Sequence, residues 1–134
     1  MPPALTPLLS LLGRILLALM FVLAGPAKIT GAEGTAAFMA SAGLPASAPL
    51  AMLVGAFEIG AGLALIVGFK ARWAALGLAL FTLVASFLFH GFWAKPPEQQ
   101  MVQQLLFLKN IAVAGGLLLL AAWGPGAWSL DSKS

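Results

Sequence analysis

The sequence predicts an all-α polytopic membrane protein in which four transmembrane helices form one bundle. Hydrophobic residues make up 61% of the 134 positions and charged residues only 8%, a balance typical of membrane proteins and unlike that of soluble domains. Four segments are also long and apolar enough to cross a bilayer. Because the chain is too short for a second core, we expect a single transmembrane domain over residues 1–134.

The expected spans cover residues 8–25, 50–69, 73–93 and 104–123. The first span ends at Gly25 and Pro26, because Pro just beyond a helix C-terminus is a typical stop signal. Residues 30–49 are too polar to span and too apolar to be a free linker. They therefore predict a short interfacial helix at about 34–42 in the first loop.

The remaining connections are short and their Lys and Arg residues favour one orientation. The loop at 70–72 carries Lys70 and Arg72 on the same side as both termini, whereas the loop at 94–103 lies on the other side. Since short cytoplasmic loops are enriched in Lys and Arg, we expect the chain to be N-in and C-in. The tail after Trp123 is expected to be frayed.

The composition excludes several kinds of function. The chain has no cysteine, which excludes thiol–disulfide exchange, Cys-ligated iron–sulfur clusters and thiolate zinc sites. One histidine cannot supply both axial ligands of a haem, and the methionines have no regular spacing, so we expect no metal and no covalently bound cofactor. The net charge of +3 is spread thinly, which gives no basis for nucleic-acid binding.

Glu58 is the central feature of the sequence, because it is a carboxylate in the middle of an apolar span. An ionised group at bilayer depth is costly and needs a partner, which by default makes it a functional-site hypothesis. Counting the helical rise places Arg14 below it and Lys109 above it, so we expect one of these cations within hydrogen-bonding distance. The predicted order from the inner to the outer side is Arg14, Glu58, Lys109, His90 and Lys28, with Asn110 beside Lys109.

This constellation suits the binding of a polar head group at membrane depth and the movement of protons. A quinone needs an apolar cleft together with donors and a protonatable group at its carbonyl oxygens, since reduction to the quinol takes up two protons. We therefore assign Glu58 and His90 as candidate catalytic residues, with Glu58 changing charge and His90 conducting protons. The candidate substrate-binding residues are Arg14, Lys28, Lys109 and Asn110. Because no electron donor is visible in the chain, a partner oxidoreductase or a bound cofactor has to supply electrons, and the chain alone is not expected to be active.

Each of these residues also has a purely structural interpretation. The Glu58 ion pair can serve only to fix the helix register, Lys28 and Arg14 can extend their ammonium and guanidinium groups to the interfaces, and His90 can be a satisfied interfacial residue. Two alternatives for the whole protein therefore stay open: a non-catalytic membrane anchor or assembly partner, and a small proton-linked permease. A homo-oligomer is also compatible with the small residues in the spans.

The chain carries an ordered set of motifs, which are Gly13-Arg14 with Gly25 and Lys28, Phe57-Glu58-Ile59-Gly60 with Leu65 and Gly68, His90, and Phe107-Leu108-Lys109-Asn110 with Gly115-Gly116. This ordered set resembles the DoxX family of small four-helix bacterial inner-membrane proteins. The family's polar positions fall on Arg14, Lys28, Glu58, His90, Lys109 and Asn110. The resemblance extends over residues 8–123 and implies a bacterial inner-membrane location.

The resemblance also implies an association with redox work. The family is named for a subunit linked to a thiosulfate:quinone oxidoreductase, and other members look like membrane partners in oxidative-stress or thiol-homeostasis complexes. The expectation is thus an integral membrane subunit of a redox system that interacts with quinone and with a partner oxidoreductase. This chain departs from the pattern in having Gly25-Pro26-Ala27-Lys28 where a plain Gly-x-x-Lys would serve. It also lacks the cysteines of some members, so a direct thiol role is not implied.

Overall fold

The computed structural model describes residues 2–133, and its described part is helical, without strands. The four long, apolar helices are α1 (Leu5–Thr30), α3 (Ala48–Val67), α4 (Ala71–Phe89) and α5 (Pro97–Trp123). The shorter elements are α2 (Ala32–Ser41) and the 3-10 helices η1 (Phe92–Ala94) and η2 (Asp131–Lys133). The predicted all-α class and the four spans are therefore confirmed.

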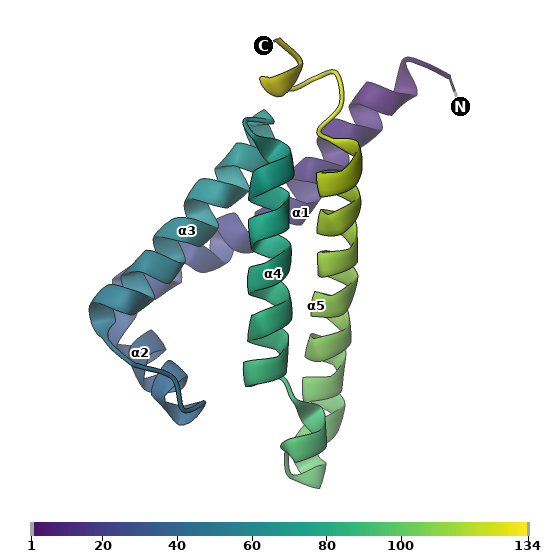
Figure 1. Ribbon diagram of the computed structural model, residues 1–134. Helices are drawn as coiled ribbons and strands as arrows, with labels where there is room; N and C mark the ends of the chain where they lie inside the picture. Colours follow the sequence, from purple (N-terminus) through teal and green to yellow (C-terminus); the bar gives the residue numbers. More distant parts are fainter. Residues whose placement is uncertain (1, 134) are drawn as a thin grey trace.

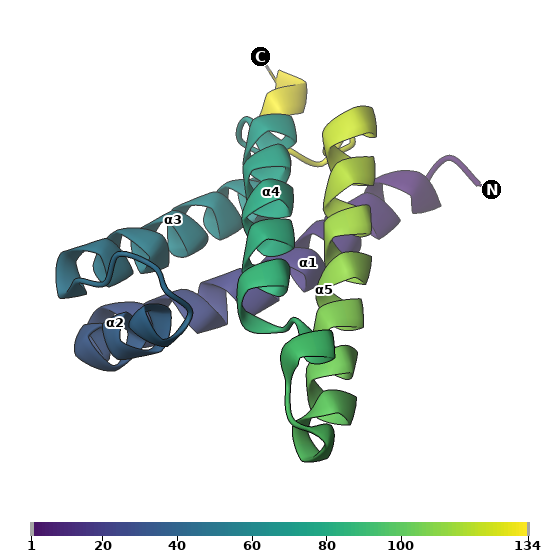
Figure 2. The ribbon, with the colours of Figure 1, turned by 60° about the horizontal axis from the view of Figure 1, so that its bottom comes forward.

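The four long helices form two closely packed pairs. α1 packs along α3 and α4 packs along α5, whereas contact between the pairs is more limited. Figures 1 and 2 show that the pairs approach each other near the end that carries both termini and diverge toward the other end. The short helix α2 lies beside the diverging ends of α1 and α3.

The predicted end of the first span was wrong, because α1 continues through Pro26 to Thr30. Proline removes one backbone N–H, but membrane helices tolerate it where neighbouring groups re-satisfy the freed carbonyls. Continuation places Lys28 in the last turn of α1, where a cation is favoured by the helix dipole. Lys28 is consequently a helical residue and not a loop residue.

The predicted loop at 94–103 is also shorter than expected. α5 begins at Pro97, because proline suits the first position of a helix, where an N–H would have no intrahelical partner. The predicted short helix of the first loop is confirmed as Ala32–Ser41, close to the predicted 34–42. α3 and α4 are joined by a tight turn in which Gly68 has φ +73° and Lys70 has φ +45°.

Small residues allow α1 and α3 to approach closely. A Cβ atom on Gly55 would lie 2.6 Å from the carbonyl oxygen of Gly25, and one on Gly62 would lie 2.8 Å from a Val22 methyl. This is the close packing expected where membrane helices associate through glycine. Gly55 and Gly62 are buried in this contact, whereas Gly60 of the same helix is exposed.

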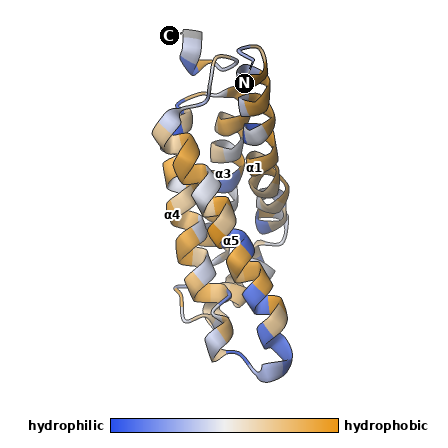
Figure 3. Cartoon of the chain, turned by 90° about the vertical axis from the view of Figure 1, so that its right-hand side faces the viewer, coloured by the Kyte–Doolittle hydropathy of each residue, from blue (hydrophilic) through white to orange (hydrophobic). Residues whose placement is uncertain are grey.

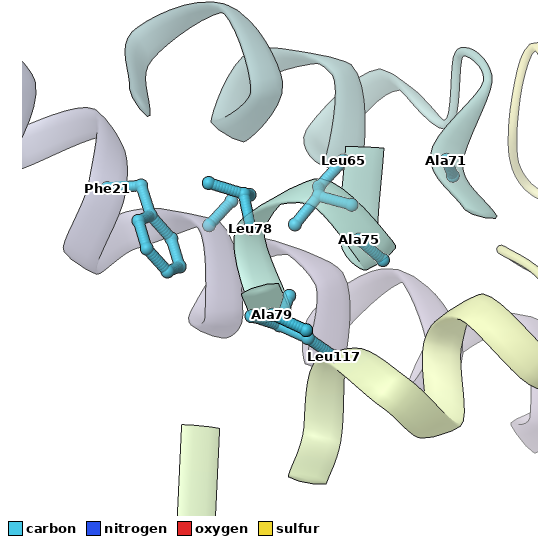
Figure 4. Close-up of a cluster of buried hydrophobic side chains, with 8 residues drawn as sticks. Phe21, Leu65, Ala71, Ala75, Leu78, Ala79 and Leu117 are labelled. Carbon is cyan, nitrogen blue, oxygen red and sulfur yellow. The ribbon is translucent and has the colours of Figure 1, made fainter. Parts of the chain in front are cut away.

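The main apolar core lies where the two helix pairs meet (Figure 4). Its buried members are Ala18, Phe21, Leu65, Ala71, Ala75, Leu78, Ala79 and Leu117. Large hydrophobic side chains of α1 point outward instead, as at Leu16 and Leu23, which are 70% and 67% exposed. Figure 3 shows that hydrophobic residues cover most of the helix surfaces, while hydrophilic residues gather at the start of α5. This distribution matches a bundle whose outer surface faces lipid.

The C-terminal tail is ordered along the α3–α4 turn, which corrects the prediction of a frayed segment. The Leu130 N–H donates to the Val67 carbonyl and the Asp131 N–H donates to the Gly68 carbonyl, both at 2.9 Å. The Asp131 carboxylate accepts from the backbone N–H groups of Lys70 and Ala71, at 2.7 and 2.9 Å. It thereby caps the N-terminus of α4, where a negative charge is favoured.

Candidate functional site

The carboxylate of Glu58 pairs with the ammonium group of Lys28. The Glu58 side chain is only 2% exposed and that of Lys28 is 29% exposed. The expectation that Glu58 would pair with Arg14 or Lys109 was therefore wrong. Lys28 pairs with Glu58 instead because α1 continues beyond its predicted end and carries Lys28 to the interface where Glu58 lies.

Local geometry directs Lys28 toward Glu58. α1 and α3 run antiparallel. Helical side chains lean toward the N-terminus of their own helix. A side chain that follows the crossing point on either helix therefore leans back toward the crossing, and the two side chains lean toward each other. A Cβ atom added at Gly55 would lie 3.1 Å from the Lys28 Cβ, so the aliphatic part of the Lys28 side chain passes beside this glycine. The Lys28 Nζ also lies 5.5 Å from the centroid of the Phe81 ring of α4. The ion pair thus sits where α1, α3 and α4 meet.

Arg14 lies elsewhere, at the terminus-bearing end of the bundle, and is 1% exposed. Its guanidinium donates to the carbonyl oxygens of Leu65 and Ile66, both at 2.9 Å, and to that of Trp128. The last carbonyls of a helix have no intrahelical partner and carry its negative dipole end. Arg14 therefore closes the C-terminus of α3, and it does not join Glu58.

A cleft of about 540 Å³ lies between the diverging helix pairs. All five α-helices contribute to its wall, which is mainly apolar and aromatic. Its polar lining includes Lys28, Glu58, His90, Lys109 and Asn110, which is five of the six predicted site residues. Arg14 is the one that the structure leaves outside.

The polar groups of the cleft come from both helix pairs. α5 supplies Lys109, which is exposed and makes no salt bridge within residues 2–133, and Asn110, which is 8% exposed. His90 caps the end of α4, and its Nδ1 lies 2.8 Å from Oε1 of Gln103. With the amide oxygen facing the ring, Nδ1 is the donor, and Nε2 of the neutral imidazole is an acceptor.

Thr82 is a cleft residue that the sequence analysis missed. Its hydroxyl is buried and makes no hydrogen bond within the described residues, although Ser86 one turn later donates to the Thr82 carbonyl at 2.8 Å. Thr82, Ser86 and His90 recur every four residues and so lie on one face of α4. This spacing in an otherwise apolar span is the signal that could have found Thr82.

α2 covers the far end of the cleft. Thr35, Phe38 and Met39 line the cavity, and the Phe38 ring stacks on Phe89 of α4 with centroids 4.7 Å apart. Met39 is buried against Ala51 of α3, so α2 bridges the two helix pairs. The predicted interfacial helix therefore also forms part of the site wall.

Comparisons with known proteins support the expected family. The DoxX family model matches residues 9–91. The inner membrane protein YqjF of Escherichia coli strain K12 is 45% identical over 122 residues, covering 90% of this chain and 88% of the relative. The inner membrane protein YphA of the same strain is 35% identical over 127 residues, covering 95% and 91%.

A more distant relative comes from a yeast. The Surfeit locus protein 4 homolog of Schizosaccharomyces pombe is 34% identical over 84 residues, covering 61% of this chain and 28% of that protein. No solved structure matches the chain. The four spans and the two Escherichia coli relatives support a multi-pass inner membrane protein. Since the family model and both of these relatives cover most of the sequence, the chain belongs to the DoxX family.

Proposed function

We propose that the cleft binds the head group of a quinone and that the chain is a membrane subunit of a quinone-linked redox system. The observation that supports this proposal is the placement of the buried Lys28–Glu58 pair, Lys109 and His90 around one mainly apolar cavity. Ligand sites typically combine an apolar wall with a few convergent polar groups. An isoprenoid tail fits the apolar wall, and the quinone oxygens fit its donors.

The polar groups of the cleft have the chemistry that a quinone requires. Lys109 and Lys28 offer N–H donors to the quinone oxygens, and Glu58 is a carboxylate that can hold a proton. His90 is half-buried at the end of α4, where it can relay protons between the cleft and the membrane surface. Reduction of a quinone to the quinol takes two electrons and two protons. In this proposal the cleft supplies the protons and a partner oxidoreductase supplies the electrons, so the chain alone does not turn over.

The proposal includes an orientation in the membrane. With both termini and the α3–α4 turn in the cytoplasm, Lys70 and Arg72 lie on the side where basic residues accumulate. The end of the cleft lined by α2 and His90 then faces the periplasmic half of the bilayer. Protons for quinone reduction would enter from that side.

Binding of a short-chain ubiquinone analogue to the purified, detergent-solubilised chain tests the proposal. Titration calorimetry should detect binding by the wild type and weaker binding by Glu58→Gln, His90→Ala and Lys109→Met. A hydrogen bond to a charged group contributes about 1.5–3 kcal/mol, so Lys109→Met should weaken binding by about tenfold or more. Lys95→Met makes the same chemical change outside the cleft and should bind as the wild type does.

Two results would remove the quinone proposal. One is the absence of binding by the wild type, and the other is equal binding by the wild type and all three cleft variants. Either result leaves the non-catalytic anchor as the better account of the ion pair. Uptake of a solute into proteoliposomes by the chain alone would favour the permease instead.

A further inference from the structure

A second cavity, of about 450 Å³, lies at the end of the bundle that carries both termini. Its wall is formed by the α3–α4 turn, the first turn of α4 and the C-terminal tail. The lining residues are Lys70, Arg72, Trp73, Pro125, Gly126, Asp131 and Ser132. It shares no residue with the cleft described above.

Two cations converge on this cavity. Lys70 has φ +45°, a left-handed conformation that is uncommon for a residue other than glycine, and its N–H is held by the Asp131 carboxylate. Arg72 extends over the C-terminal end of α5. A Cβ atom added at Gly124, the residue that ends α5, would lie 3.0 Å from the Arg72 Nε. Neither cation forms a salt bridge within residues 2–133. The Lys70 Nζ lies 5.8 Å from the centroid of the Phe69 ring, a contact that leaves N–H donors on the ammonium group, so both cations can still bind an anion.

The acidic residue of the cavity is already engaged. Both carboxylate oxygens of Asp131 accept backbone N–H groups at the start of α4, where the helix dipole also compensates negative charge. Asp131 further interacts electrostatically with the buried Arg14. Asp131 is thus held at the start of α4, and the two cations outnumber this one carboxylate in the lining of the cavity.

The cavity lies at the depth of lipid head groups. Trp73 lines it and is 74% exposed, and Trp123 and Trp128 at the same end are 82% and 51% exposed. Exposed tryptophans at the ends of membrane spans mark the interface between hydrocarbon and water. A ligand held here would sit beside the phosphate layer, and basic pockets at this level suit anionic lipid head groups.

We propose that this cavity binds the phosphate of one anionic phospholipid, with Lys70 and Arg72 as its cationic ligands. Arg72 can donate two parallel N–H bonds to phosphate oxygens, and Lys70 adds a point charge. The exposed face of Trp73 contacts the glycerol and upper acyl region. The bound lipid would thereby cover the junction of α3, α4 and the tail.

Native mass spectrometry of the full chain in mild detergent tests the proposal. The wild type, supplied with phosphatidylglycerol or phosphatidylcholine of the same acyl chains, should retain one phosphatidylglycerol per chain and little phosphatidylcholine. Each cation near an anionic lipid contributes about fivefold in affinity, so the double variant Lys70→Asn, Arg72→Gln should bind roughly 25-fold more weakly. Asn is chosen because it tolerates the left-handed conformation of residue 70. Lys95→Gln removes a cation at the other end of the bundle and should leave binding unchanged.

Three results would overturn the assignment. Equal retention of phosphatidylglycerol and phosphatidylcholine by the wild type does so without any variant. A double variant that unfolds at the same temperature as the wild type but still prefers phosphatidylglycerol to phosphatidylcholine would also overturn it. In a third arm, displacement of phosphatidylglycerol by inorganic phosphate alone would identify a free-anion site instead of a lipid site.

Discussion

Gly25 of α1 and Gly55 of α3 bring the backbones of the two helices into contact. A Cβ atom on Gly55 would lie 2.6 Å from the Gly25 carbonyl oxygen, and one on Gly25 would lie 2.8 Å from the Gly55 carbonyl oxygen. Cβ atoms do not occur this close to oxygen, so a larger residue at either position has to separate the helices. Lys28 and Glu58 lie one turn further along each helix, and the crossing therefore also controls their ion pair.

Gly55→Ala should destabilise the bundle even though alanine is the better helix former. Overpacking typically costs about 1–3 kcal/mol, which exceeds the gain of about 1 kcal/mol or less in helix propensity. Unfolding in detergent, followed by tryptophan fluorescence, measures the difference. Gly60→Ala is the matched control, because a Cβ there meets no atom within 4 Å, and it should be neutral or slightly stabilising. Equal stability of the two variants would contradict the close crossing.

Lys28→Met should leave a buried, unpaired carboxylate at Glu58. Removing one partner of a buried pair costs about 3–5 kcal/mol, and the lower value is expected here because the Lys28 side chain is 29% exposed. The double variant Lys28→Met, Glu58→Gln should recover much of this loss, since it removes the bare charge. Lys95→Met serves as the control and should unfold as the wild type does. Additive effects of the Lys28 and Glu58 substitutions would show that the two residues are not coupled.

The fold could be predicted from the sequence because hydrophobicity in a membrane protein reports directly on the spans. Two predicted helix boundaries were wrong, because α1 continues through Pro26 and α5 already begins at Pro97. In lipid a proline removes one hydrogen bond without ending the helix, since the flanking backbone has no better partner than itself. α1 therefore ends at Thr30, whereas α5 begins at Pro97, where proline suits the first position of a helix.

The candidate site was predictable as a set of residues, but its pairing was not. Glu58 stood out because a charge at bilayer depth needs a partner, and five of the six chosen residues line one cleft. Which cation reaches Glu58 depends on the extra turn of α1 that carries Lys28. Arg14 binds carbonyls at the end of α3 and in the tail, and such backbone contacts leave no pattern in side-chain spacing.

Asp131→Ala should loosen the attachment of the tail to the α3–α4 turn. The side chain caps two N–H groups at the start of α4, and loss of an N-terminal cap typically costs about 0.5–2 kcal/mol. Asp131→Asn keeps one acceptor oxygen without the charge, so its loss of stability should be smaller. Unfolding in detergent gives the stability, and limited proteolysis reports cleavage near Ala127 and Trp128. Wild-type stability and protection in Asp131→Ala would show that the cap has no energetic role.

Lys70→Cys and Glu98→Cys test the proposed orientation in intact bacterial cells. Each variant carries only one thiol, because the native sequence has no cysteine. A membrane-impermeant maleimide added outside should label Glu98→Cys, at the start of α5, and should label Lys70→Cys only after the cells are lysed. The reverse pattern would place both termini in the periplasm.

The hydrogen bond from Arg14 to the Trp128 carbonyl also has a consequence for how the chain is made. The two residues are separated by 114 positions. Arg14 lies in the first span, and the other three spans lie between it and Trp128. Because synthesis runs from the N-terminus, Arg14 is made and can enter the membrane long before the Trp128 carbonyl exists. During that interval water or lipid phosphate has to solvate the exposed side of Arg14. The terminus-bearing end of the bundle is thus the last part of the protein to mature.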